Sequence, residues 1–247
     1  MSSARSIKTL GLAGLMAVMA MMVVAAVGAA TASAGLPEFV LKAGKTFPVK
    51  FTSVSGEKIL KIVGSSELEW IRCKKDKNTG EIINAKEDRV TITFEECKVD
   101  STTIECHSIK PTQAAGIITT YPLKSKLVYV WPRKGKETAI DLEPVTTGGL
   151  FVEFECKTVA TIIQVRKSVL GVVTPLNVFA EKFELAVKEV GGVQSPSEYE
   201  VEGSGKGTVD KLECSKNGGA FVACTEVEVT PDVITLLPAK ETGEIKA

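Results

Sequence analysis

The sequence contains a single histidine, His107, so any Ser–His or Cys–His catalyst would have to use it. It contains no G-x-S-x-G segment, which would supply a serine nucleophile, and no redox C-x-x-C pair. No two cysteines have the close spacing of a zinc knuckle. We therefore name no catalytic, cofactor or metal residue, and we expect His107 to be a strand-end residue without catalytic duty.

An excess of charge of one sign is also missing. The chain of 247 residues has 30 Lys plus Arg and 30 Asp plus Glu. Removal of the N-terminal segment 1–34, which holds Arg5 and Lys8, changes the net charge from 0 to −2. This balance gives no electrostatic reason to expect nucleic acid or anionic lipid as a partner.

Aromatic residues are scarce, at 6% of the chain. Sugar sites tend to present aromatic platforms, and Tyr129 and Trp131 share one face of an expected strand, so they are the candidates for an exposed binding pair. The alternative is that both rings pack on the sheet. Paired carboxylates could make a glycosidase, but thirty acids single out no pair. A calcium site at Asp76-Lys77-Asn78 lacks a third ligand.

The first residues have the layout of a secretory signal peptide. Arg5 and Lys8 precede an uncharged apolar run over residues 10–30, and Ala32-Ser33-Ala34 is a small-x-small cleavage site. We expect cleavage after Ala34, which leaves an extracellular mature chain of residues 35–247. The alternative is a retained membrane anchor, because the run is long enough to span a bilayer of roughly 30 Å.

An even number of cysteines in an exported chain predicts disulfide bonds. A hairpin with Ser101-Thr102 at its tip would place Cys97 and Cys106 in a non-hydrogen-bonded pair, where side chains approach closely. The turn signal Asn217-Gly218-Gly219 lies between Cys214 and Cys224. The expected bonds are Cys97–Cys106, Cys214–Cys224 and, by remainder, Cys73–Cys156.

Most of the mature chain alternates as β-strands do. In the segment Arg89–Glu95, for example, Val90, Ile92 and Phe94 would face one side. The segment Val178–Val190 fits a strand better than a helix. The clearest expected strands are Thr46–Thr52, Arg89–Cys97, Lys126–Trp131, Leu150–Cys156 and Thr158–Val165. We therefore expect an all-β fold, either sandwich-like or a partly closed barrel, stapled by disulfides.

Two glycine-rich segments need an interpretation. Residues 191–197 either separate a C-terminal unit or connect strands within one sheet. The string Gly203–Thr208 (GSGKGT) matches the core of a phosphate-binding loop, but Glu200 stands where that loop needs its first glycine. A strand should precede such a loop and a helix should follow it. We expect a flexible turn instead.

The cysteine frame and several short segments resemble a group of exported bacterial β-rich proteins of unknown function. The resemblance covers roughly residues 70–200 and implies a signal peptide and a β-rich mature domain; it assigns no functional residue. The segments are Val90–Phe94, Cys97, Cys106, Gly116–Thr120, Pro122-Leu123, Leu142–Pro144, Phe154–Cys156, Ser168–Gly171, Thr174–Asn177 and Gln194.

With no catalytic constellation, the sequence favours a non-catalytic extracellular binding or structural module. Its partners would be the cell wall, the extracellular matrix or another protein, with no nucleic acid and no membrane after signal cleavage. Two alternatives stay open. One is a secreted hydrolase that uses paired carboxylates, and the other is a carrier of a small apolar ligand inside a cavity.

Overall fold

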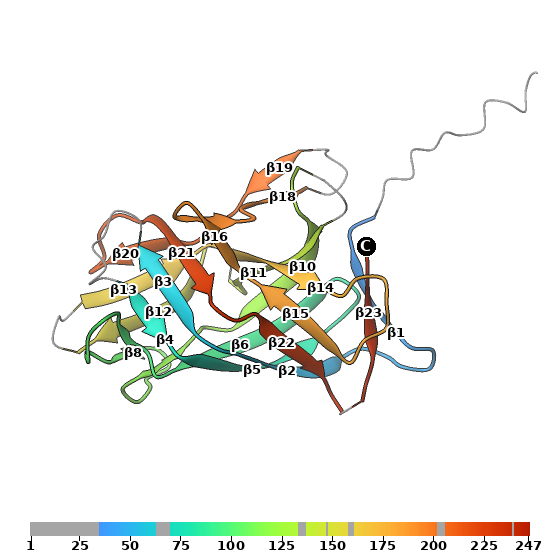
Figure 1. Cartoon of the computed structure of the whole chain (residues 1–247), viewed down its shortest axis with the longest axis horizontal. Coiled ribbons are helices and arrows are strands. Elements are labelled where there is room, and N and C mark those ends of the chain that lie inside the picture. Colours follow the sequence, from blue (N-terminus) through green and yellow to red (C-terminus); the bar gives the residue numbers. More distant parts are fainter. Residues whose placement is uncertain are drawn as a thin grey trace, which may run out of the picture. The chain divides into compact units, whose positions relative to one another are not determined.

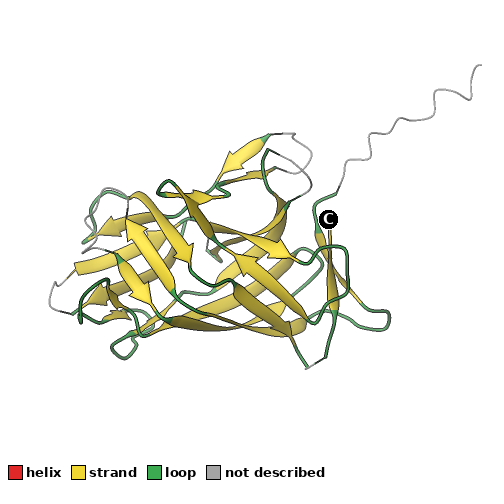
Figure 2. Ribbon diagram, in the orientation of Figure 1, coloured by secondary structure: helices red, strands yellow, loops and turns green. Residues whose placement is uncertain are grey.

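The structure is a computed structural model, and it describes residues 35–62, 70–132, 137–146, 148–157, 161–201, 206–238 and 240–247. The predicted signal peptide, residues 1–34, lies outside them. Residues Leu36–Ala247 form one compact unit. The regular structure of its described part consists of β-strands alone (Figure 2), which confirms the predicted all-β fold. In this part of the chain no helix is long and apolar enough to cross a bilayer.

Eight antiparallel strands form a closed barrel, because β6 and β10, at the two ends of the strand order, pair with each other. Closure leaves no unpaired edge within the ring. A short additional strand, β9 (Ile117–Thr119), pairs with β6. In order around the ring, the barrel strands are β10 (Leu123–Tyr129), β11 (Thr138–Pro144), β14 (Val169–Thr174), β15 (Lys182–Ala186), β22 (Asp232–Leu236), β2 (Val49–Ser55), β5 (Lys75–Ile82) and β6 (Glu87–Glu95).

A second sheet of eight strands is nearly closed, since a single bridge between Lys98 and Glu105 links its two ends. All six cysteines lie in or beside its strands, so we call it the cysteine sheet. In order, its strands are β7 (Lys98–Val99), β4 (Ile71–Cys73), β3 (Lys58–Ile62), β21 (Val222–Glu228), β20 (Glu213–Lys216), β13 (Thr161–Arg166), β12 (Leu150–Cys156) and β8 (Cys106–Ser108).

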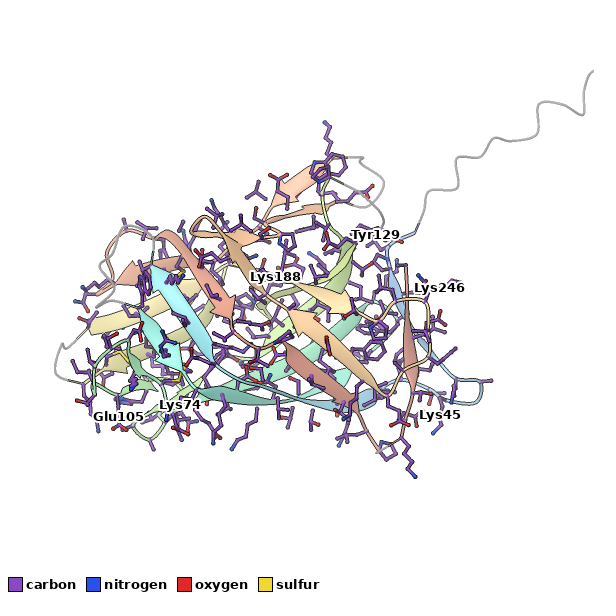
Figure 3. The ribbon with its side chains drawn as sticks, in the orientation of Figure 1. Lys45, Lys74, Glu105, Tyr129, Lys188 and Lys246 are labelled. Carbon is purple, nitrogen blue, oxygen red and sulfur yellow. A yellow bond between two sulfur atoms is a disulfide. The ribbon has the colours of Figure 1, made fainter. Side chains whose placement is uncertain are left out.

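The closed barrel and the cysteine sheet are joined by strands that run from one into the other. β2 leads into β3 and β21 into β22 (Figure 1), and only Lys74 separates β4 from β5 (Figure 3). β6 leads into β7 in the same way. One hydrophobic cluster contains Ile92 and Leu142 of the barrel together with Phe154 and Val165 of the cysteine sheet. The two bodies therefore share a core.

Three two-stranded sheets complete the unit. The pair β1 (Glu38–Leu41) and β23 (Gly243–Lys246) packs Phe39 and Ile245 against the barrel interior. The hairpins β16 (Lys188–Val190)–β17 (Val193–Ser195) and β18 (Glu198–Glu200)–β19 (Gly207–Val209) follow each other along the chain. Tyr199 of β18 packs against buried side chains of β10, β11 and β14, so β18 covers part of the outer face of the barrel.

The alternation of apolar and polar residues in the sequence predicts in most places which side chains are buried. Ile92 is buried, and Val90 and Phe94 pack against the same core. Phe151, which interrupts the pattern of its segment, lies at a register shift in β12 and is itself buried. The segment Val178–Val190 forms β15 and β16, so the preference for strand over helix is confirmed.

Residues 191–197 do not lead to a separate C-terminal unit. They form the turn of the β16–β17 hairpin, strand β17 and the start of the connection to β18. The strands that follow return to both bodies, β20 and β21 to the cysteine sheet and β22 to the closed barrel. The topology therefore supports the interpretation of residues 191–197 as a connection between strands.

The structure joins all six cysteines, as Cys73–Cys97, Cys106–Cys156 and Cys214–Cys224. The last pair is the predicted one, whereas the predicted Cys97–Cys106 and Cys73–Cys156 bonds are wrong. Cys106 and Cys156 are register partners on β8 and β12, and the register of β4 with β7 brings Cys73 opposite Cys97. Each end strand of the cysteine sheet is thus bonded to its neighbour.

The predicted Cys97–Cys106 bond is wrong because these two residues form a hydrogen-bonded pair in the hairpin and not a non-hydrogen-bonded one. Cys97 and Cys106 do face each other, but the Cys106 N–H donates to the Cys97 carbonyl at 3.0 Å. Side chains of such a hydrogen-bonded pair lie farther apart than those of a non-hydrogen-bonded pair. A turn in which the Thr102 N–H donates to the Val99 carbonyl at 3.1 Å sets this phase. Both thiols are then left for cysteines on the neighbouring strands.

Candidate functional site

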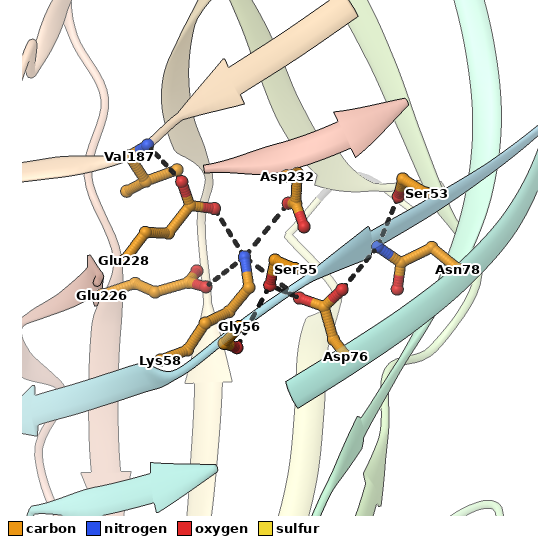
Figure 4. Close-up of polar contacts among 10 residues, drawn as sticks. All are labelled: Ser53, Ser55, Gly56, Lys58, Asp76, Asn78, Val187, Glu226, Glu228 and Asp232. Carbon is orange, nitrogen blue, oxygen red and sulfur yellow. Dashed lines mark hydrogen bonds and ion pairs between the residues drawn. The ribbon is translucent and has the colours of Figure 1, made fainter. Parts of the chain in front are cut away.

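A buried cluster of charged residues lies where the closed barrel and the cysteine sheet join. At its centre is Lys58, the first residue of β3, whose exposed fraction is 5%. Four carboxylates surround its ammonium group (Figure 4). Measured from Lys58 Nζ, the nearest carboxylate oxygens are those of Glu228 at 2.5 Å, Asp232 at 3.0 Å, Asp76 at 3.1 Å and Glu226 at 3.6 Å.

The strand ends explain why these residues meet. Asp76 is near the start of β5, Glu228 ends β21 and Asp232 begins β22, so each stands at the passage between the two bodies. Side chains of a strand alternate between its faces, which turns Asp76 and Asn78 inward and the lysines beside them outward. The polar side chains therefore meet at the junction because the alternation of each strand turns them to its inner face.

Hydrogen bonds hold the carboxylates in place (Figure 4). Ser55 Oγ donates to Asp76 at 2.8 Å, and the backbone N–H of Val187 donates to Glu228 at 2.7 Å. Asn78 Nδ2 donates to Ser53 Oγ at 2.7 Å and to Asp76 at 3.2 Å. The cluster is thus fixed by residues of the barrel as well as by Lys58.

Burial perturbs the acids of this cluster strongly. It raises the pKa of Glu228 to about 8 and that of Asp76 to about 6, against the opposing effect of Lys58. It also raises the pKa of Glu226. Burial by itself would lower the pKa of Lys58, but the four carboxylates outweigh it and raise that pKa well above its usual value. Lys58 is therefore a fixed cation and not a nucleophile.

Lys58 occupies the position that a metal ion would take in a ring of carboxylates. Asp76 and Asn78, the weak calcium hint of the sequence, do point into the junction, but Asp76 binds the Lys58 ammonium group and Asn78 donates a hydrogen bond to Asp76. Among the described residues, no group of three or more His, Cys, Asp or Glu side chains is arranged to hold a metal ion.

Two cavities flank the cluster, and Lys58 and Glu226 line both of them. The cavity inside the cysteine sheet has a volume of about 60 Å³ and apolar walls that include Phe94, Phe154 and Leu212. The cavity inside the closed barrel has a volume of about 50 Å³ and walls of mixed polarity. Both are far smaller than the ~300–1,000 Å³ of typical ligand pockets.

A larger hollow of about 350 Å³ lies on the outside of the closed barrel, and we call it the Trp131 groove. It is bounded by the ends of β10 and β11, by β14 and by the segment that joins the two outer hairpins. Its lining combines an indole ring and two prolines with two carboxylates, an amine and two hydroxyls. The residues are Val130, Trp131, Pro132, Glu137, Val172, Lys188, Ser195, Pro196, Ser197 and Glu198.

Backbone contacts position Trp131. Its N–H donates to the Glu198 carbonyl at 3.0 Å, which ties the end of β10 to β18. A Cβ atom at Gly207 would lie 2.2 Å from the indole ring, so only glycine lets β19 approach this closely. The groove is therefore built by the β18–β19 hairpin lying against the end of a barrel strand.

The structure separates the two aromatic residues that the sequence placed together. Tyr129 has an exposed fraction of 3%, so its proposed role in an exposed binding pair is wrong. It continues the inward set of Leu123, Ser125 and Leu127 on β10 and lies near the end of that strand (Figure 3). Trp131 lies beyond the strand end, is half-buried and lines the groove.

The remaining candidates do not form sites. His107 Nε2 lies 3.2 Å from a Glu155 oxygen across β8 and β12, and with every cysteine in a disulfide no thiol is left for it to activate. Residues 203–205 of the GSGKGT string lie outside the described residues. Gly207 and Thr208 belong to β19, which pairs with β18, so this end of the string is strand and not a phosphate-binding loop.

The buried cluster was not found from the sequence. Lys58 is one of 30 basic residues, and nothing in its neighbourhood distinguishes it. The only signal was the polar Asp76 and Asn78 in an alternating segment, whose partners come from strands far along the chain.

The chain matches no protein-family model, no curated protein and no solved structure. Its function therefore has to be argued from the geometry of these sites.

Proposed function

We propose that the mature chain is an exported, non-catalytic binding module whose ligand lies in the Trp131 groove. The observation that carries this proposal is the groove volume of about 350 Å³. It falls within the range of ligand pockets, whereas the cavities inside the closed barrel and the cysteine sheet do not. The three disulfides fit an oxidising, extracellular environment.

The lining of the groove favours a carbohydrate, such as a cell-wall glycan. The Trp131 indole offers an apolar platform for the C–H face of a sugar ring, while Glu137, Glu198 and Ser197 offer hydrogen-bond partners for its hydroxyls. Lys188 adds an amine that could bind an acidic or acetylated substituent. An aromatic anchor with a few polar groups around it is the usual composition of such a site.

A glycan array with the secreted protein tests the proposal. We expect binding to a cell-wall oligosaccharide, and a loss of roughly thirtyfold in affinity for Trp131→Ala, which corresponds to about 2 kcal/mol for truncation of an aromatic anchor. The control is Trp70→Ala, since Trp70 lies beneath Lys61 and away from the groove. The proposal fails if no glycan binds, or if Trp131→Ala binds as tightly as the wild type.

The same groove contains Glu137 and Glu198, which keeps a carboxylate hydrolase as the second candidate. Incubation of the bound oligosaccharide with the protein, followed by mass analysis of the sugar, distinguishes the two. A binding module leaves the sugar intact. Cleavage that is lost in both Glu137→Gln and Glu198→Gln would replace the proposed function by hydrolysis.

A further inference from the structure

The Lys58 cluster contains more negative than positive charge. Its one ammonium group faces four carboxylates, which leaves a net charge of −3 when every group is ionised. The side chains are buried, and the most exposed of them, that of Glu226, is only 13% exposed. Uncompensated charge in a buried site is costly, because water cannot solvate it. The folded protein therefore needs a way to reduce this excess of negative charge.

The described residues supply no second cation to the cluster. Lys58 is the only basic residue among those that line the two cavities beside it. On the same strand, the Lys61 ammonium group lies 2.6 Å from a Glu189 oxygen, and Arg72 of the neighbouring β4 pairs with two other acids. Protonation of a carboxylate removes one negative charge without any further side chain. The composition of the cluster thus favours a bound proton.

Hydrogen bonds indicate which oxygens can carry that proton. An ammonium group donates three hydrogen bonds, and three carboxylates already lie within 3.1 Å of Lys58 Nζ. Glu226 is the fourth, at 3.6 Å, beyond hydrogen-bond distance. Asp232 Oδ1 accepts no hydrogen bond from the described residues. Both oxygens of Glu228, by contrast, have donors, in Lys58 and the Val187 N–H. The oxygens of Glu226 and Asp232 are therefore the ones available to a proton.

We propose that the Lys58 cluster is a proton-dependent latch between the closed barrel and the cysteine sheet. While the proton is bound, the cluster has one negative charge fewer, and the strands that pass between the two bodies stay packed. Loss of the proton leaves that charge buried at the passages from β4 to β5 and from β21 to β22. We expect the junction to open to water there before the rest of the protein unfolds. Because Lys58 and Glu226 line both cavities, the opening reaches both interiors.

The pH range of the latch follows from the acids that form it. Burial raises the pKa of Glu228 from 4.5 to about 8 and also raises the pKa of Glu226. The acids interact so closely that the proton belongs to the cluster and not to one residue. The folded cluster therefore keeps, at pH 7, a proton that the unfolded chain has released. Its stabilisation is complete below about pH 4.5 and is lost as the pH rises through 8.

Two other buried acids titrate below this range. Burial raises the pKa of Asp76, within the cluster, and that of Asp88, in the barrel cavity, to about 6 each. Between pH 6.5 and pH 8 these two acids together change the unfolding equilibrium constant by less than about twofold, because both are already largely ionised. The titratable groups that face the cluster or its cavities are Lys58, Asp76, Asp88, Glu226, Glu228 and Asp232.

Urea unfolding of the protein at pH 6.5 and at pH 8 tests the latch, which is independent of the Trp131 groove. For one proton on the cluster, we expect the unfolding equilibrium constant to increase about fifteenfold over this range. Glu226→Gln removes one negative charge at nearly constant shape and should reduce the increase to about threefold or less. Glu184→Gln, at an exposed position of β15, is the matched control and should keep the wild-type increase. Comparison with this control cancels the contribution of groups outside the cluster, His107 included. No increase in the wild type, or the full increase in Glu226→Gln, would overturn the proposal.

Amide hydrogen exchange at pH 7 and at pH 9, corrected for the intrinsic pH dependence of exchange, shows where the protein opens. We expect protection at pH 9 to fall in β3, β5, β21 and β22 and to persist in the pair β1–β23, which contributes no residue to the cluster. This experiment uses the wild type, so it decides the question even if Glu226→Gln does not fold. A uniform loss of protection, or none, refutes a latch at the junction.

Discussion

The closed barrel and the cysteine sheet contain the same number of strands in their rings but are held together by different means. The barrel closes through an uninterrupted ladder of strand pairs, and no cysteine lies in it. The cysteine sheet lacks the last pairing, and its end strands β7 and β8 are only two and three residues long. Disulfides bond each of these ends to the next strand. Covalent bonds thus stand where the hydrogen-bond ladder is weakest.

The cavities of the two bodies also differ in polarity. The cavity of the cysteine sheet is lined mainly by apolar side chains, whereas the barrel encloses Asp88, Asn78 and two serines. The Lys58 cluster, at the junction, is where the two interiors meet. Its residues come from both bodies, so its ion pairs connect the barrel to the cysteine sheet without a covalent bond. Each of the following changes removes one of the interactions that hold the barrel, the cysteine sheet or their junction together.

Removal of Lys58 should have the largest effect. Lys58→Met leaves four carboxylates buried without their cation, and we expect the free energy of unfolding to fall by about 5 kcal/mol, the upper end for breaking a buried pair. Lys61→Met is the matched control, because Lys61 is on the same strand, is more exposed, and pairs with Glu189. It should cost about 1 kcal/mol or less. Urea unfolding measures both; similar losses would contradict the role of the cluster.

The disulfides should follow, in the order of the loops that they close. In the chain-entropy model the losses are about 4 kcal/mol for Cys106–Cys156, about 3.5 for Cys73–Cys97 and about 3 for Cys214–Cys224. The sequence separations are 50, 24 and 10 residues. Urea unfolding of the three double Cys→Ser variants checks the order. If the loss were smallest for Cys106–Cys156, the end strands of the cysteine sheet would not depend on their disulfide bonds.

The contribution of Asp88 to the pH dependence comes next, and it adds to that of the Lys58 cluster, whose buried acids also have raised pKa values. Burial raises the pKa of Asp88 from 3.8 to about 6, so the folded state holds its proton more tightly than the unfolded state. The stabilisation is complete below pH 4 and is lost as the pH rises through 6, about 3 kcal/mol in total. Urea unfolding at a series of pH values between 4 and 8 measures this loss. Asp88→Asn should remove this part of the pH dependence, and a profile identical to wild type would refute the assignment.

The sequence predicted the strand content well because burial in a sheet has a period of two that single segments reveal, as for Val90, Ile92 and Phe94. It did not predict the disulfide partners of Cys97 and Cys106, because a shift of one step in the hairpin changes which pairs are close. Closure of the barrel rests on the pairing of β6 with β10, which no local pattern encodes.

The candidate sites were only partly predictable for the same reason. Trp131 was identified as a candidate from its aromatic character, but the groove around it depends on Gly207 and on residues 195–198, which meet it through the tertiary fold. The Lys58 cluster brings together residues separated by as many as 174 positions. Its acids are ordinary in the sequence and become unusual only through burial.

Amide hydrogen exchange, resolved strand by strand, tests most directly the claim that the two bodies are held by different means. Reduction of the wild type should lower protection first in β7, β8 and β12, whereas Lys58→Met with its disulfides intact should lower it first at the junction, in β3, β5, β21 and β22. Loss of protection in the same strands under both treatments would contradict the claim, because it would mean that one set of restraints holds the whole unit.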